Sequence, residues 1–184
     1  MWRYKYGRVL GRTCPISTNQ DLWVGDDCRL LVMTNDKAWL DVLLVVQEDE
    51  FFALSKHGTI RGTVYFQIGE NQFFPGQGWT DLVAAFVGAW VGGLVRVAEG
   101  ISKQERVSFF DGPFVVDISM PEKGFFNLSF VRDEKSVISK TVEIKHLLAH
   151  GQSVARELLS HCQYRQWSNR DTEMLDRIVK LMRY

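Results

Sequence analysis

The fold is decided by a nearly unbroken apolar stretch, WTDLVAAFVGAWVGGLVRV, at residues 79–97. Small and large apolar residues each recur in it at spacings of three and four, which predicts a helix that is apolar on all sides. Such a helix is buried in a globular protein, so we expect it at the centre of the fold. Thr80 or Gly78 is expected to cap its start, and Asp81 suits the positive end of the helix dipole.

The glycines of this helix indicate close packing. Glycine costs about 1 kcal/mol at a helical position relative to alanine, so a helix that contains several of them is expected to gain something from the small side chain. We therefore predict that neighbouring elements approach the helix closely at Gly88, Gly92 and Gly93.

Segments on both sides of the helix have the patterns of β-strands. Residues 59–68 alternate apolar and polar side chains with a period of two, as in a strand that is buried on one face. The turn sequence Asp111-Gly112-Pro113 predicts a hairpin. Further strands are expected at residues 29–34, 38–47, 105–110, 114–120, 125–132 and 136–145.

The last part of the chain changes to a helical period. One helix is expected from about His146 and another over residues 171–183, with Ser168 or Asn169 as the N-cap of the second. We therefore predict a single α+β domain over residues 1–184. In it, a mostly antiparallel sheet packs on the central apolar helix, and two helices follow at the C-terminal end.

Composition narrows the classes of partner. The 184 residues carry 22 basic and 22 acidic side chains, and this balance argues against a nucleic-acid binder, which needs clustered Lys and Arg. The 3 cysteines are irregularly spaced and fit a reducing cytoplasm. The uncharged run at 82–95 is shorter than the roughly 20 residues of a membrane-spanning helix. We expect a cytoplasmic protein with no membrane and no nucleic-acid partner.

Residues with catalytic or metal-binding chemistry form no convincing group in the sequence. His146 and His150 share a helix face, but a zinc site needs a further ligand. The nearest candidates, His161 and Cys162, lie several turns further along the same helix and cannot reach the same ion. The neighbours His161 and Cys162 point about 100° apart in a helix and rarely meet. We expect capping or solvent-facing histidines, an unreactive thiol, and no metal or catalytic residue.

Two other features permit binding without catalysis. The glycine-rich segment 75–80 precedes a helix, but it lacks the lysine of a phosphate-binding loop and the spacing of a dinucleotide-binding motif, so no cofactor is expected. Paired acids at 26–27, 48–50 and 133–134 are typical of solvated loops. They also suit an acidic patch that speeds association with a basic partner.

Two segments resemble a known group of proteins. These are residues 68–81, IGENQFFPGQGWTD, and the later Phe109-Phe110-Asp111-Gly112-Pro113-Phe114, joined by the helix that carries Trp90 and Leu94. Together they are similar to a group of small bacterial cytoplasmic proteins with the pattern FP…W.D…L..W…L and a later F.DGP. Several of these look like immunity proteins of polymorphic toxin systems, including contact-dependent growth inhibition. The chain departs from the pattern at Phe114, where tyrosine is expected.

The resemblance implies a non-enzymatic binding protein. Its partner is the C-terminal toxin domain of a cognate exported effector, which it keeps inactive in the producing cell by covering the active site or by pairing a sheet edge with a toxin strand. The motif residues are expected to be structural. The predicted contact residues are acidic: Asp26, Asp27, Glu48, Asp49 and Glu50.

Two alternatives remain open at this point. An adaptor or oligomeric scaffold is distinguished by self-association without a toxin partner. A small hydrolase with an unrecognised site is distinguished by turnover or a bound metabolite in the purified protein.

Overall fold

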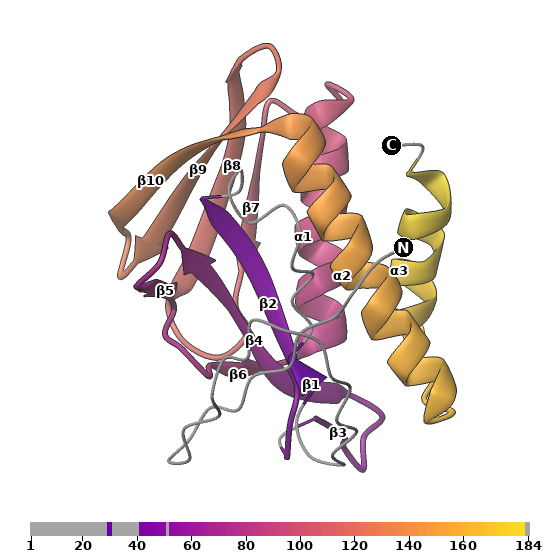
Figure 1. The fold of residues 1–184 in the computed structure, drawn as a ribbon. Coiled ribbons are helices and arrows are strands. Elements are labelled where there is room, and N and C mark those ends of the chain that lie inside the picture. Colours follow the sequence, from indigo (N-terminus) through magenta and orange to yellow (C-terminus); the bar gives the residue numbers. More distant parts are fainter. Residues whose placement is uncertain (1–28, 31–40, 51, 183–184) are drawn as a thin grey trace, which may run out of the picture.

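The computed structural model describes residues 29–30, 41–50 and 52–182, and it shows an α+β fold in which all strand pairings are antiparallel (Figure 1). The predicted fold class is therefore confirmed. The strands form two sheets rather than one.

The first sheet is built around β4 (Ile60–Ile68). β4 pairs with β2 (Val42–Glu48) on one side, and β5 (Gln72–Phe74) and β6 (Thr80–Asp81) also pair with it. Two short strands complete the order β1-β2-β4-β3, namely β1 (Arg29–Leu30) and β3 (Ala53–Leu54). The predicted strand is present as β4, and four residues of its predicted apolar face lie in the core: Ile60, Val64, Phe66 and Ile68. The expectation that only this face is buried is wrong in the middle of the strand, where Thr63 and Tyr65 of the other face are 1% and 3% exposed.

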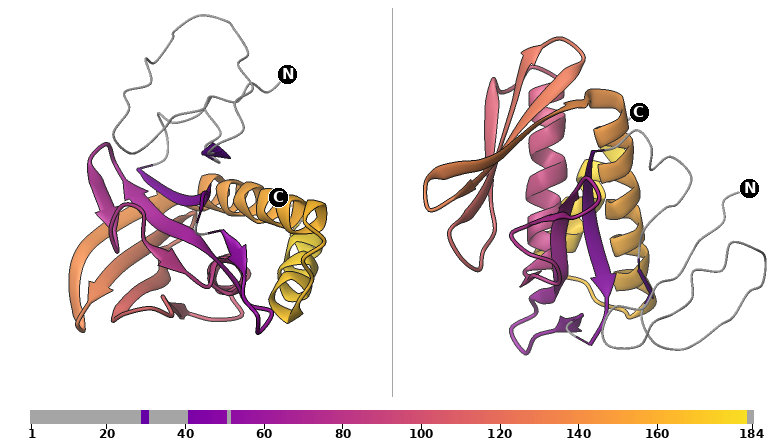
Figure 2. Two further views of the ribbon diagram at one scale, coloured as in Figure 1. Left: turned by 90° about the horizontal axis from the view of Figure 1, so that it is seen from below. Right: turned by 60° about the vertical axis from the view of Figure 1, so that its left-hand side comes forward.

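The second sheet follows the chain in the order β10-β9-β8-β7. Its strands are β7 (Gln104–Ser108), β8 (Phe114–Glu122), β9 (Phe125–Arg132) and β10 (Lys135–Glu143). All four agree with the predicted segments to within a few residues. Figure 2 shows this sheet on one side of the helices.

The central helix α1 (Val83–Ala98) contacts both sheets and both later helices, α2 (Ile144–Tyr164) and α3 (Arg170–Leu181). It begins later than the expected Trp79, because Thr80 and Asp81 pair with β4 instead. Neither predicted cap is used, since the N-cap residue is Leu82 and no side chain caps it. The predicted Asn169 does cap α3, where its side chain accepts a hydrogen bond from the Thr172 N–H at 2.9 Å.

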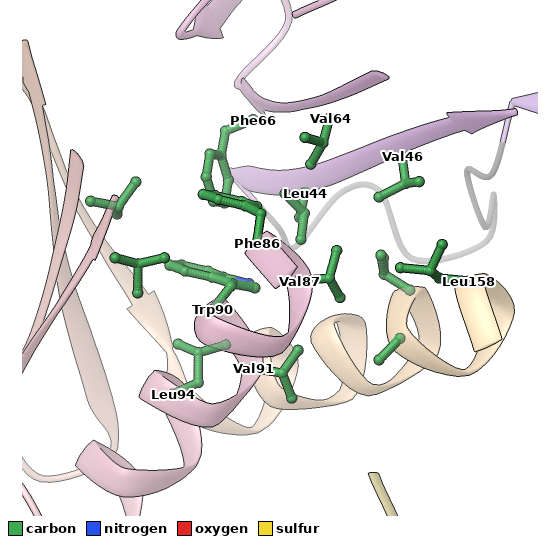
Figure 3. Close-up of a cluster of buried hydrophobic side chains, with 14 of the residues drawn as sticks. Leu44, Val46, Val64, Phe66, Phe86, Val87, Trp90, Val91, Leu94 and Leu158 are labelled. Carbon is green, nitrogen blue, oxygen red and sulfur yellow. The ribbon is translucent and has the colours of Figure 1, made fainter. Parts of the chain in front are cut away.

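One aromatic cluster joins the two sheets through α1. Trp90 is fully buried, and its ring centroid lies 4.8 Å from that of Phe66 on β4. Phe66 also meets Phe130 of the second sheet at 5.3 Å. In Figure 3, Trp90 and Phe86 of α1 lie beneath Phe66, and Val87 and Val91 lie on the side of α1 that faces α2. Across the described part of the chain, no helix has the length and apolar character needed to cross a membrane.

Candidate interaction surface

The predicted acidic segment lies at the end of β2, beside the last turn of α2. The Glu48 carboxylate accepts a hydrogen bond from Arg165 Nη2 at 2.6 Å and lies 3.1 Å from His161 Nδ1. Asp49 is half-buried and Glu50 is exposed. Glu48 thus ties β2 to α2, and within 48–50 it is Glu50 whose side chain is most open to a partner. The other two predicted contact residues, Asp26 and Asp27, lie outside the described residues.

Aromatic side chains surround this ion pair. The Arg165 guanidinium lies 5.1 Å from the ring centroid of Trp167 and 5.7 Å from that of Phe52. The side chain of Tyr164, next to it, is 88% exposed. Tyr, Trp and Arg are the residues that most often dominate protein–protein binding energy. We name this surface the α2 corner: Glu48, Glu50, Phe52, Tyr164, Arg165 and Trp167.

A second exposed aromatic side chain projects from the turn between β7 and β8. Phe110 is 54% exposed, although its backbone is held from below by the fully buried Asp81. Asp81 Oδ2 accepts hydrogen bonds from the N–H groups of Phe110 at 2.9 Å and Asp111 at 3.3 Å. Its Oδ1 accepts from the Leu82 N–H at 2.6 Å. An internal carboxylate therefore occupies the start of α1, directly after the glycine-rich segment 75–80.

The two segments that carry the sequence resemblance pack against each other. The ring of Phe114 lies 4.9 Å from that of Trp79 and 5.7 Å from that of Phe74, both in edge-to-face geometry. Gly112 has a φ of +95°, and a Cβ there would lie 2.7 Å from the Phe114 ring. The Arg132 guanidinium also lies over Phe114, 5.2 Å from the ring centroid. These contacts are all internal, so they shape the β7–β8 turn.

A third feature is a groove of about 570 Å³ between the C-terminal half of α1 and α3. Two large apolar side chains, Ile101 and Leu181, are exposed along it. Arg96 also lines it and makes two hydrogen bonds to the Glu105 carboxylate, at 2.8 and 2.9 Å. These bonds lower the pKa of Glu105. The remaining lining residues are Gly92, Val95, Glu99 and Ile178.

The histidines of α2 bind the chain itself. His146 Nδ1 lies 3.1 Å from Glu143, and His150 Nε2 lies 3.0 Å from both the nitrogen and the oxygen of Leu44 on β2. Within the described ranges, no three His, Cys, Asp or Glu side chains are grouped as a metal ion would need. Burial raises the pKa of the Cys162 thiol to about 11, so it carries little of the reactive thiolate at neutral pH.

Comparisons of the chain with protein-family models, with curated proteins and with solved structures found no match. Function is therefore inferred from these surfaces together with the resemblance in sequence.

Proposed function

We propose that this protein is an immunity protein, which binds the toxin domain of a cognate effector of a contact-dependent growth inhibition system and neutralises it in the cytoplasm of the producing cell. The observation that carries the proposal is the α2 corner. In it, the ion pair with Glu48 and the ring of Trp167 hold Arg165 in place, and the neighbouring Tyr164 is exposed. Glu50, two residues after Glu48, is exposed as well.

This surface combines two kinds of contribution to binding. The rigid Arg165 and Trp167 lose little conformational entropy on association, because their side chains are already held in place. The exposed carboxylate of Glu50 attracts a basic partner, which mainly raises the association rate. An inhibitor needs both tight and rapid binding to its target.

The test is co-expression with the product of the reading frame immediately upstream in the source genome. Rescue of growth and co-purification as a tight complex are expected. Glu50→Lys should slow association, whereas the matched charge reversal Glu122→Lys, in the exposed end of β8, should not. Absence of toxicity and of a complex would contradict the proposal.

A second candidate function is an oligomeric scaffold, and the groove beside α3 favours it. Exposed apolar side chains gathered at one place often mark a contact between proteins. Light scattering of the purified chain separates the two functions. A concentration-dependent mass that Leu181→Glu abolishes, without any toxin partner, would favour the scaffold.

A further inference from the structure

We infer that the toxin-facing surface continues from the α2 corner to the β7–β8 turn, and that the Phe110 side chain inserts there into an apolar pocket of the toxin domain. This inference rests on the proposed function. The inference adds Phe110 to the acidic residues that were predicted from the sequence to contact the partner.

The turn that presents Phe110 is held on every side. Asp81 fixes the N–H groups of Phe110 and Asp111 from within the protein. The Phe109 N–H donates to the Phe114 carbonyl at 2.9 Å and closes the turn. On the flanks, Arg61 of β4 pairs with the Asp111 carboxylate, and the Asp133 N–H donates to the Pro113 carbonyl at 3.3 Å.

Burial of the Asp81 carboxylate, taken alone, lowers the stability of the folded protein. A buried carboxylate loses its hydration, and the loss is offset only when hydrogen bonds replace the water. Asp81 meets this need with the backbone donors of Leu82, Phe110 and Asp111. The result is a rigid turn whose neighbouring Phe109 is buried while Phe110 points outward. A side chain on a fixed backbone binds with little loss of entropy.

Strand register places the backbone of Asp81, the residue that holds the turn, near that of Glu48 in the α2 corner. Gln47 of β2 lies opposite Thr63 of β4, and Thr63 lies opposite Thr80 of β6. Glu48 and Asp81 are the next residues of their strands, so their backbones are about 10 Å apart, two strand spacings. A typical interface covers about 800 Å² on each partner, which is enough to span both sites.

The experiment measures binding of the full chain to the purified product of the upstream reading frame, with rates as well as affinity. Phe110→Ala is expected to weaken binding about thirtyfold, the loss typical of an aromatic hot spot, mainly through faster dissociation. Phe125→Ala is the matched control. Phe125 is also a partly exposed phenylalanine, at 39%, but it lies at the start of β9, whereas the end of β9 at Arg132 pairs with Phe114 beside the turn. This control should leave the affinity unchanged.

A photoreactive phenylalanine analogue gives a second readout that does not depend on stability. Placed at position 110 it should crosslink to the toxin domain, and placed at position 125 it should not. Wild-type affinity in Phe110→Ala, or a crosslink from position 110 only to a second copy of the chain, would overturn this inference while the proposed function stands. If the wild-type chain forms no complex, both this inference and the proposed function are contradicted.

Discussion

At the scale of single residues, Asp81 is the side chain on which the β7–β8 turn depends. Asp81→Ala removes the acceptor of the N–H groups of Leu82, Phe110 and Asp111. Hydrogen bonds to a charged group contribute about 1.5–3 kcal/mol each, and buried donors without a partner add a penalty. We expect the free energy of unfolding to fall by about 3 kcal/mol or more in urea denaturation. Asp111→Ala, which removes only a half-exposed ion pair with Arg61, should cost less than about 1 kcal/mol.

His150 makes the stability of the protein depend on pH. Burial of the ring lowers its pKa, and the hydrogen bond with Leu44 opposes this shift. The unfolded chain, with an ordinary histidine pKa of about 6.5, therefore binds more protons in acid than the folded chain. The contribution of His150 to stability is complete above about pH 6.5 and is lost as the pH falls towards the lowered pKa of the folded state.

The measurement is urea denaturation of the wild type and of His150→Gln between about pH 5 and pH 8. Glutamine can accept from the Leu44 N–H or donate to its carbonyl, but it does not titrate. The free energy of unfolding should fall less steeply in acid for the variant, since the other histidines are common to both proteins. Equal slopes would show that His150 is not buried against β2 in solution.

At the scale of elements, the glycines of α1 differ in what they contact. A Cβ at Gly93 would lie 3.2 Å from Ile118 Cδ1 and 3.4 Å from Val107 Cγ2, so the second sheet packs closely there. A Cβ at Gly88 would meet only Met174 Cε, at the ordinary distance of 3.8 Å. We expect Gly88→Ala to raise the free energy of unfolding by up to about 1 kcal/mol, through helix propensity alone. Gly93→Ala should gain less or lose stability, and equal gains in thermal unfolding would contradict this difference.

Periodicity predicted the elements of this fold better than their ends and partners. The alternation of residues 59–68 predicted β4 because one of its faces lies in the core, but it did not indicate that Thr63 and Tyr65 of the other face are buried as well. The start of α1 was misplaced because Thr80 and Asp81 suit a helix locally, and only β4, distant in sequence, draws them into β6. The division into two sheets is likewise set by contacts between distant segments, which a strand pattern does not contain.

The same limit applies to the candidate site. The acids at 48–50 were visible in the sequence, but the pairing of Glu48 with Arg165 depends on where α2 ends. Phe110 belonged to a motif that was expected to be structural. The hydrogen bonds that the Asp81 carboxylate accepts from the N–H groups of Phe110 and Asp111 help to fix the turn in which Phe109 is buried and Phe110 is exposed. The nearby Gly112-Pro113 predicted the turn between the two strands, but it did not indicate that the turn presents an exposed side chain.

At the scale of the whole molecule, α1 joins parts that would otherwise be separate. It packs against β4 of the first sheet, against β7 and β8 of the second, and against α2 and α3. Trp90 sits in this junction, fully buried and in contact with the Phe66 ring. Neither sheet can keep its apolar face from water without the helix, so the described elements should unfold together.

This shared core predicts one cooperative transition, in which tryptophan fluorescence and far-ultraviolet circular dichroism coincide during urea denaturation. Trp90→Ala should lower the free energy of unfolding by about 3–5 kcal/mol and shift both signals together, because the cavity opens between all the layers. Under conditions where the variant remains folded, it should still bind the proposed toxin partner, since Trp90 reaches no surface. Two separated transitions would mean that the sheets are independent units. A folded Trp90→Ala protein that no longer binds would place α1 at the interface instead of in the core.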